Sequence, residues 1–544
     1  MTTRLTPTRL ALAVAALLLP LTATANQSLN SAGYSATIGG VINEGSVHSS
    51  SFNPAGNNLL LHKDDKFRFG YLSNLGAYVE IGEADDLDVK VDALVDDLSD
   101  IDNFSNAAAR ARLEARYGLL AGGEAAYYEA IANKANTEII TDLEQGGQFR
   151  TGAQLQLPLT PFLFRSTLAS GTFSLNASAS AQVKGAFLGG EFGVNTHFKN
   201  GNTELGSFDI NLEKAAGAYQ AIEAELEAAG NNLSAANIAN IESILKTSGA
   251  LPAKGNNEAT IAALQQEISN NGTFKPTVNT TLTTDSGLDV KAAVVAHLAL
   301  GYGTNLSEAF ELDRTHGQLE MGTRLNFYSV ETGRKFVSIQ AEADNNNGSK
   351  TSDSLTEDFL DNTEKSVGFG LDVGFLWHSN NYQAGITFYN LNEPSFDYPD
   401  LNAYINDKAT KSAINGLQAA GKIKAVDSVT LTRHAVVEAA YYTNSRNWML
   451  QGAYTLGTAT NFVGDEFQNL HLAAGYFPKT AWLPGVRLGY SQNMKGSELS
   501  KIHAGATFFG IMHLDVALSP DTSTFDGTEV PRYAAISLGF EEKF

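Results

Sequence analysis

The sequence predicts an all-β transmembrane protein, an antiparallel outer-membrane β-barrel of about 14 strands (range about 12 to 16) with an N-terminal plug-like segment and helical inserts. Three observations predict this fold class. Apolar residues recur at every other position over strand-length segments, the chain starts with an export signal, and it ends on an alternating strand with a terminal phenylalanine. These features divide the chain into a signal peptide over residues 1–25, a plug-like segment over 26–66 and the barrel over 67–544.

The composition narrows the classes of function. The 544 residues include no cysteine, and 59 acidic against 37 basic side chains give a formal net charge of −22. The lack of cysteine excludes disulfide scaffolds, thiolate metal sites and cysteine nucleophiles. The acidic balance argues against nucleic-acid binding, which needs clustered lysine and arginine. After the signal, no apolar run reaches the roughly 18–20 residues of a membrane-spanning helix, which excludes a helical membrane bundle.

The first residues are typical of a secretory signal. Arg4 and Arg9 precede an apolar run over residues 10–21, which is too short to cross a bilayer as a helix. A small-x-small site follows, so we expect cleavage between Ala25 and Asn26. The alternative, an uncleaved N-terminal anchor, would need a longer apolar run and no cleavage site.

A turn ends the segment before the first predicted strand. It consists of Asn53, Pro54, Ala55 and Gly56. Proline restricts the backbone at the start of the turn, and the asparagine side chain can bond its own backbone. We therefore expect residues 26–66 to form a plug-like unit that ends where the barrel wall begins.

Alternation is clearest in the second half of the chain. Between Ser366 and Trp377, apolar side chains at odd positions alternate with mostly small or polar residues, and further segments up to residue 518 repeat this pattern between turn signals. A soluble β-sandwich also alternates, but its strands average about five or six residues, whereas these have about 8–12. A transmembrane barrel directs its apolar face to lipid and its polar face to a wet lumen, and this arrangement explains the pattern better.

The polar faces of these strands supply the candidate lumen residues. They are charged or imidazole-bearing side chains that we expect to point inward: Asp372, His434, Glu438, His471, Arg487, His503, His513 and Asp515. Aromatic residues such as Trp377, Trp448 and Trp482 lie near strand ends, as interfacial girdles require.

Three inserts are predicted to be helical, near residues 85–145, 212–270 and 400–427. In the first, apolar residues from Leu87 to Ile101 follow helical spacing, and aspartates occupy the other positions. The second should contain at least two helices, with breaks near Gly230 and residues 249–252. Such inserts must lie outside the hydrocarbon zone or inside the lumen.

The C-terminal strand resembles the assembly signal of outer-membrane barrels. Phe540 and the terminal Phe544 fit the alternation, whereas Glu542 stands where the pattern expects an apolar residue. Because this end lies near the membrane interface, a charge there costs little. The signal implies contact with the barrel-assembly machinery.

No segment predicts a catalytic, cofactor-binding or metal site. The aspartates around residues 80–102 lack an EF-hand pattern, because Lys90 stands where the calcium loop needs glycine, and a solvated helix face explains them. Histidines on the lumen face are explained by solvation or hydrogen bonding. Only His513 and Asp515, neighbours on one face of one strand, are candidates for a hydrolytic or proton-relay site. Nucleophile-elbow, phosphate-loop and HExxH motifs are absent from the sequence.

The turn at Asn53, with the glycine-rich segment before it, resembles the N-terminal signature of FadL-like outer-membrane transporters. In that family, the segment before the first strand folds into the barrel as a plug. The order of further motifs is similar to the TraF-type conjugal plasmid transfer family of FadL-like barrels. These motifs are the acidic stretch after the turn, residues 390–399, Asn447-Trp448, residues 485–490 and 504–506, and His513-Leu514-Asp515. A periplasmic thioredoxin-like conjugation protein shares the TraF label, but the lack of cysteine excludes that kind.

The resemblance implies a non-enzymatic component of plasmid transfer or envelope biogenesis in the outer membrane of a double-membraned bacterium. Its partners would be outer-membrane lipid, the barrel-assembly machinery and other envelope or conjugation proteins, without a cofactor and without direct nucleic-acid binding. Two alternatives stay open. The first is a FadL-like channel for hydrophobic compounds, which needs an apolar pocket under the plug and a lateral opening, although the predicted lumen faces are mostly polar. The second is a barrel-borne enzyme that uses His513 and Asp515.

Overall fold

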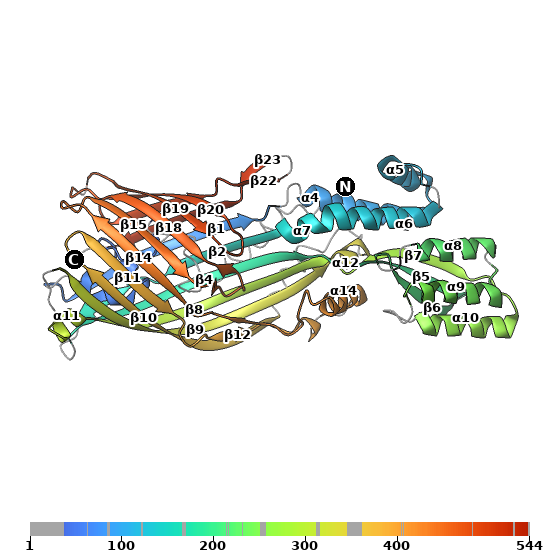
Figure 1. The fold of residues 1–544 in the computed structure, drawn as a ribbon, viewed down its shortest axis with the longest axis horizontal. Helices are drawn as coiled ribbons and strands as arrows, with labels where there is room; N and C mark the ends of the chain where they lie inside the picture. Colours follow the sequence, from blue (N-terminus) through green and yellow to red (C-terminus); the bar gives the residue numbers. More distant parts are fainter. Residues whose placement is uncertain are drawn as a thin grey trace.

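A closed antiparallel barrel of 14 strands forms the body of the molecule in the computed structural model (Figure 1). The predicted fold class is confirmed. The structure describes residues 37–541, except 38, 62–63, 84–86, 121–122, 166–169, 214, 216, 231, 251–256, 312–315, 345–361, 404, 406, 481 and 526–527. The expected signal cleavage site at Ala25 and Asn26 and the terminal Phe544 lie outside the described residues.

The ring closes because the first strand pairs with the last strand and with the second. A short extra strand, β3 (Phe162–Arg165), continues the line of β2 and fills the wall between β1 and β4. In ring order the strands are β1 (Phe67–Ile81), β24 (Tyr533–Glu541), β21 (Met512–Leu518), β20 (Ser500–Phe508), β19 (Gly485–Asn493), β18 (Asn469–Tyr476), β15 (Trp448–Leu456), β14 (His434–Tyr442), β11 (Tyr382–Tyr389), β10 (Thr363–His378), β9 (Gln318–Ser338), β8 (Gly287–Asn305), β4 (Thr172–Leu188) and β2 (Gln148–Gln156).

The connections differ between the two ends of the barrel. At one end, here called the turn end, several are short, as at residues 379–381, 443–447 and 509–511, and the longest run over 157–171 and 306–317. At the other end, here called the crown end, lie the three large inserts. β1 starts at the turn end and β24 finishes there, as the alternation of antiparallel strands requires.

Among the described strands, five are longer than the expected 8–12 residues, and the three longest are neighbours. β4, β8 and β9 have 17, 19 and 21 residues. Their pairing continues to Leu188, Gly287 and Ser338, beyond the ends of the shorter strands (Figure 1). The long strands thus form a one-sided extension of the wall that supports the inserts.

The first two inserts form one unit, here called the crown (residues 87–146 and 192–284). The first contributes only helices. The second contributes a three-stranded sheet of order β6-β5-β7 and three helices, one more than the minimum expected. The elements are α4 (Leu87–Asp102), α5 (Ala107–Tyr117), α6 (Gly123–Lys134), η3 (Ala135–Ile140), α7 (Thr141–Gly146), β5 (Phe192–Asn200), β6 (Thr203–Asn211), α8 (Ala218–Ala228), α9 (Ala235–Thr247), α10 (Asn257–Asn271) and β7 (Thr277–Thr284).

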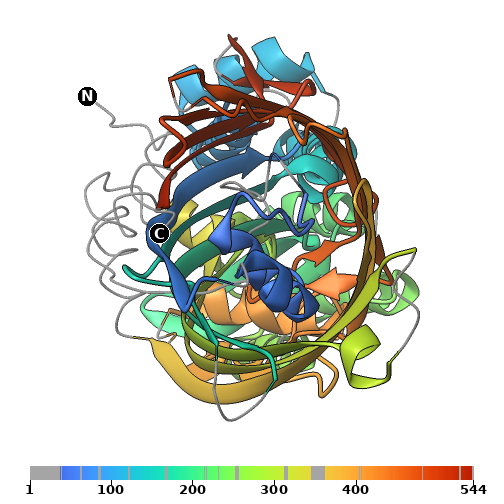
Figure 2. The ribbon, with the colours of Figure 1, turned by 90° about the vertical axis from the view of Figure 1, so that its left-hand side faces the viewer.

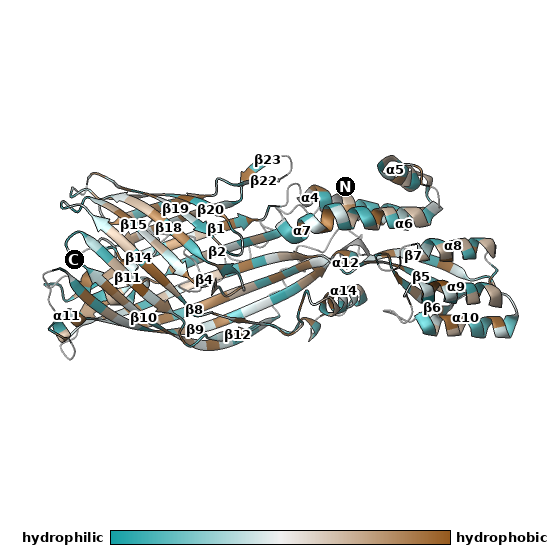
Figure 3. Cartoon of the chain, viewed as in Figure 1, coloured by the Kyte–Doolittle hydropathy of each residue, from teal (hydrophilic) through white to brown (hydrophobic). Residues whose placement is uncertain are grey.

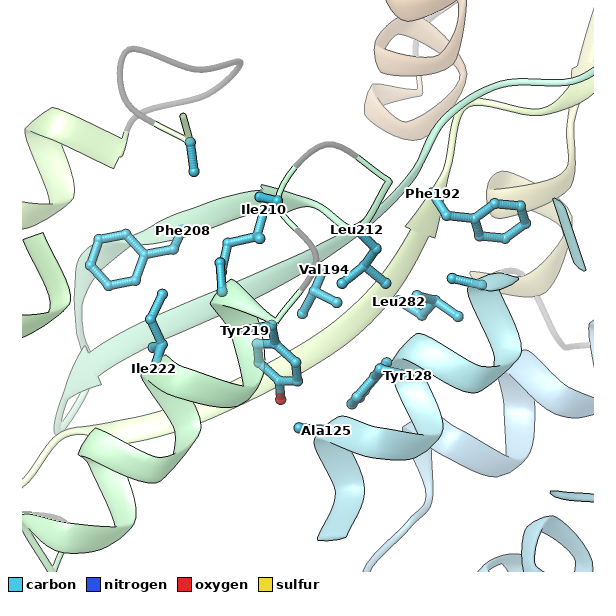
Figure 4. Packing of buried hydrophobic residues seen from close by; sticks show 14 of the residues in the cluster. Ala125, Tyr128, Phe192, Val194, Phe208, Ile210, Leu212, Tyr219, Ile222 and Leu282 are labelled. Carbon is cyan, nitrogen blue, oxygen red and sulfur yellow. The ribbon is translucent and has the colours of Figure 1, made fainter. Parts of the chain in front are cut away.

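One apolar core joins the two parts of the crown (Figure 4). Tyr128 of α6 meets Tyr219 of α8 edge to face, with ring centroids 5.5 Å apart, and donates a hydrogen bond to the carbonyl of Thr280 at 3.0 Å. Phe192 and Val194 of β5 are fully buried beside them. Burial of apolar area at roughly 25 cal/mol per Å² makes this core the main source of the crown's stability.

The third insert covers part of the crown end. It contains β12 (Ser395–Asp397), η4 (Leu401–Ala403), α14 (Lys408–Ala419) and β13 (Ser428–Thr430). Ile414 and Leu417 of α14 pack in a cluster with Phe336 of β9. Lys422 reaches the first insert through an ion pair with Glu144 at 2.5 Å.

The outer surface of the wall is apolar. Hydrophobic and hydrophilic residues alternate along the strands (Figure 3), and outward side chains such as Val367, Leu450 and Leu488 are more than half exposed. This is the pattern of a wall whose outer face meets lipid. Among the described residues, no helix is long and apolar enough to cross a membrane.

Candidate functional site

The segment before the first strand lies inside the barrel, where it forms a plug (residues 37–61) near the turn end (Figure 2). Asn53 begins a short helical turn, and its side chain accepts a hydrogen bond from the backbone N–H of Ala55 at 3.0 Å. Pro54 occupies the first position of that turn, where its missing N–H costs nothing. The plug's helical elements are η1 (Val47–Ser51), η2 (Pro54–Gly56) and α3 (Asn57–Leu60).

Three glycines of the wall receive the plug turn. Gly303 of β8 pairs with Gly322 of β9, which in turn pairs with Gly374 of β10, so the three form a transverse row, here called the glycine row. A Cβ atom at Gly322 would lie 2.2 Å from the carbonyl carbon of Pro54, and one at Gly374 would lie 2.0 Å from the side-chain oxygen of Asn53. The turn can touch the wall backbone only because these side chains are absent.

Two carboxylates of the wall hold the plug by hydrogen bonds. Glu438 of β14 accepts one from the Asn53 amide at 2.7 Å and one from the backbone N–H of Ile42 at 2.9 Å. Glu541, at the end of β24, accepts one from the Ser46 hydroxyl at 2.5 Å and one from the next backbone N–H at 3.0 Å. These four hydrogen bonds to buried carboxyl groups fix the plug's position.

Basic and phenolic side chains complete the attachment. Arg324 of β9 donates to the backbone carbonyl of Ser51 and forms an ion pair with Asp372 of β10 at 2.9 Å. The Tyr389 hydroxyl donates to the carbonyl of Phe52 at 2.5 Å. The plug is therefore held by charged groups on several strands around the ring.

The structure places seven of the eight candidate lumen residues in the interior, with relative exposures of 7% or less: Asp372, Glu438, His471, Arg487, His503, His513 and Asp515. Arg487 and Asp515 form an ion pair at 2.8 Å, and both bond the Thr37 hydroxyl of the plug. The rings of His471 and His503 lie 5.2 Å apart. His434 is half-buried at the start of β14 and stacks on Tyr389, apart from the others.

His513 and Asp515 have different partners. The His513 Nδ1 lies 2.9 Å from the Thr507 hydroxyl, and its Nε2 lies 3.9 Å from Glu541. Asp515 is engaged by Arg487 and the plug. The geometry therefore ties both residues to the plug and its anchors. Among the described residues, no group of three or more His, Asp or Glu side chains could hold a metal ion.

The wall is interrupted at one place. β2 ends at Gln156 and β3 begins at Phe162, and opposite this gap β1 shifts register between Gly70 and Leu75. The interruption is closed by hydrogen bonds, among them Ser73 Oγ to the carbonyl of Thr160 at 3.2 Å.

Several anchors were not among the predicted site residues. Glu541 and Arg324 lie on alternating strands, and the period of two would have placed both on the inner face. The glycine row gives no comparable signal, because its members are far apart in sequence and are brought together only by strand register.

Comparison with known protein families shows the family to which the chain belongs. A family model described as "F plasmid transfer operon, TraF, protein" matches residues 51–454, well over half of the chain. The chain belongs to this TraF family. The matched part of the TraF chain starts within the plug and includes the plug turn, the glycine row, Arg324 and Glu438, whereas Asp515 and Glu541 lie beyond it.

Solved structures also align with this TraF-family chain. The "TodX deltaS2S3 mutant monoaromatic hydrocarbon channel" aligns over 96% of this chain and 99% of its own, with 9% identity and a TM-score of 0.35. The toluene transporter TbuX of Ralstonia pickettii aligns over 94% and 98%, with 8% identity and a TM-score of 0.33. A comparison with curated proteins gives no match.

Proposed function

We propose that the protein is a non-enzymatic outer-membrane barrel that serves conjugal plasmid transfer as an envelope component. Membership of the TraF family, whose description names the F plasmid transfer operon, is the observation that carries this proposal. The apolar outer face of the barrel supports insertion in an outer membrane. Its partners would be outer-membrane lipid, the barrel-assembly machinery through β24, and other envelope or conjugation proteins.

The arrangement of the connections supports an orientation. Outer-membrane barrels keep short turns in the periplasm and longer loops outside the cell. With the short connections at the turn end, the plug lies near the periplasmic mouth and the crown projects from the cell surface. A rigid extracellular unit of this size is suited to contacts with another surface or protein.

The packing inside the barrel supports a structural or gated role over an open pore. The lumen near the turn end is filled by a plug with many polar attachments, and Glu438, Glu541 and Asp515 each bond it. Of the candidates for chemistry, Asp515 is engaged in those attachments and His513 bonds Thr507 of the wall, which supports a non-enzymatic function.

The test is an in-frame deletion of the gene in a plasmid-bearing donor, scored by mating frequency and by uptake of a labelled aromatic hydrocarbon. We expect transfer to fall and to return when the intact gene is supplied, while uptake stays unchanged. Normal transfer in the deletion strain would contradict the proposal. Normal mating frequency in donors that carry the His513→Ala and Asp515→Ala variants would remove the enzymatic alternative.

A second function, a channel for hydrophobic compounds, is favoured by one observation. The interruption between β2 and β3 lies opposite the register shift of β1 and offers a place for lateral exit into lipid. The polar lumen counts against this function, because a path for apolar compounds needs an apolar lining. Loss of hydrocarbon uptake with unchanged mating in the same deletion strain would favour the channel.

A further inference from the structure

A short connection crosses the lumen at the crown end. Residues 457–468, here called the strap, link β15 to β18 and contain the hairpin of β16 (Ala459–Thr460) and β17 (Glu466–Phe467). Figure 2 shows this orange hairpin inside the ring. The strap begins at β15 and its tip reaches β2, which lies seven places away in the ring of fourteen strands. It therefore spans the barrel from one side to the opposite side.

The tip of the strap holds its own shape. The Asn461 side chain accepts hydrogen bonds from the backbone N–H groups of Val463 at 3.1 Å and Asp465 at 2.8 Å. Gly464 takes a positive φ of 77° in this turn. Because asparagine and glycine stabilise such turns locally, the tip can move as a unit without losing its conformation.

Ion pairs attach the tip to the far wall. The Asp465 carboxylate lies 2.8 Å from Nε of Arg150 on β2 and 2.7 Å from Nζ of Lys184 on β4. Burial opposes ionisation of Asp465, but Lys184 and Arg150 outweigh it and lower the pKa of this carboxyl below its usual value. The tip thus carries a charged carboxylate between two cations. Arg150 also pairs with Glu80 of β1 at 2.9 Å, so loss of Asp465 removes the ion pairs that hold the tip while Arg150 keeps a second partner.

An apolar contact accompanies the ion pairs. Phe462 and Val463 are each 1% exposed. The Phe462 ring packs 5.6 Å from that of Tyr328 and 5.5 Å from that of Phe396, and its carbonyl accepts a hydrogen bond from the Tyr398 hydroxyl at 2.5 Å. The tip is therefore docked against the third insert as well as against the wall.

A glycine hinge lies at the first root of the strap. Gly457 directly follows β15, takes a positive φ of 83° and has nothing within 4 Å of the position of a Cβ atom. The pairing of β15 with β18 runs from Trp448 and Tyr476 to Tyr454 and Leu470, outside the strap. A swing of the strap about Gly457 would break side-chain hydrogen bonds at its roots, such as Thr432 to the carbonyl of Thr458 at 2.9 Å, but would leave the pairing of β15 with β18 intact.

We propose that the strap is a gate at the extracellular mouth of the barrel, distinct from the plug, and that Asp465 with Arg150 and Lys184 forms its latch. The geometry gives the barrel two barriers in series, the plug toward the turn end and the strap toward the crown end. Passage through the lumen then requires both to move. This inference depends on the proposed function in one respect only, namely which side of the membrane the mouth faces.

The test uses the cysteine-free chain, expressed in intact cells with a single Val463→Cys reporter, and measures its reaction with a membrane-impermeant maleimide. Val463 is buried while the strap is latched. Asp465→Asn and, from the opposite wall, Lys184→Gln should each speed labelling about tenfold or more by raising the open fraction. Asp289→Asn is the matched control, because Asp289 also forms an ion pair with an arginine at 3.0 Å and is similarly buried, yet its partner Arg334 lies off the strap.

The outcomes separate the gate from the proposed location. Leu119→Cys, at an 85% exposed crown position, should label rapidly in intact cells, and failure to do so would contradict the orientation. If Leu119→Cys labels but Val463→Cys labels equally slowly with and without Asp465→Asn and Lys184→Gln, the latch is refuted. If Asp289→Asn accelerates the labelling of Val463→Cys equally, the latch is also refuted, because loss of any buried ion pair would then loosen the barrel. Heat-modifiable gel mobility confirms that each variant has folded.

Discussion

The substitution Gly322→Ala is the most direct test of how the plug is seated. The added Cβ would lie 2.2 Å from the carbonyl carbon of Pro54 and 2.3 Å from the backbone nitrogen of Ala55, whereas ordinary contact begins near 3.4 Å. Both atoms are backbone, so no side chain can turn aside. The plug turn must retreat from the wall by about 1 Å.

That displacement strains the strongest bonds of the turn. The Asn53 amide bonds Glu438 at 2.7 Å and the carbonyl of Phe375 at 3.2 Å. Loss of a buried hydrogen bond costs about 1–3 kcal/mol, so the docked plug should be destabilised by roughly 2–5 kcal/mol. At about 1.4 kcal/mol per factor of ten, the ratio of displaced to docked plug rises by about 30- to 4,000-fold.

The assay is ion conductance of the purified protein in planar bilayers, with heat-modifiable mobility as the check on folding. Because the strap would still close the mouth, the comparison is made in the Asp465→Asn background, in which the strap is unlatched. We expect the Asp465→Asn parent to stay closed and Gly322→Ala in this background to open frequently. Gly452→Ala is the matched control, because its Cβ would approach the end of the Leu472 side chain at 3.1 Å, away from the plug. A folded Gly322→Ala protein that conducts no more than its Asp465→Asn parent would refute the seating of the turn on the glycine row.

Three further predictions concern the plug and the crown. Glu438→Ala leaves the Asn53 amide and a backbone N–H without their acceptor, so docking should weaken by about 2–4 kcal/mol and hydrogen exchange of plug amides should accelerate. Burial, and then repulsion by Glu124, raise the pKa of Glu223 to about 7, so crown stability should fall as pH rises from about 4.5 to 7. Burial also raises the pKa of Glu124, so Glu223→Gln should reduce this slope without removing it and add about 1 kcal/mol at pH 8, measured by thermal melting. Asp100 accepts ion pairs from two arginines of α5, and Asp100→Ala should cost about 1–3 kcal/mol of crown stability, seen as a lower Tm and as a faster release of α5 by protease.

The wall could be predicted from the sequence because its signal is local. The alternation between Ser366 and Trp377 reflects one strand with lipid on one side and polar groups on the other, and it needs no knowledge of neighbours. The same holds for the helical spacing from Leu87 to Ile101, which corresponds to α4. The turn at Asn53 was recognisable because asparagine and proline act on their own backbone.

The features that depend on register and on long-range contact could not be predicted. The glycine row exists only because β8, β9 and β10 are aligned so that three glycines become neighbours. The crossing of the lumen by Asp465 depends on the diameter of the ring and on the inward direction of a connection. The excess length of β4, β8 and β9 was also missed, since polar positions near their ends are compatible with loops as well as with strands.

The bonds of Glu541 impose an order of events during biogenesis. This residue lies at the end of β24 and accepts a hydrogen bond from the Ser46 hydroxyl, which is 495 positions earlier in the chain. The N-terminal segment leaves the ribosome first, yet it gains this anchor only when the C-terminal strand has been laid against its neighbours. Until β24 pairs with β1 and closes the ring, the N-terminal segment lacks this anchor or is bound by a chaperone. Complete docking of the plug is therefore a marker of complete assembly.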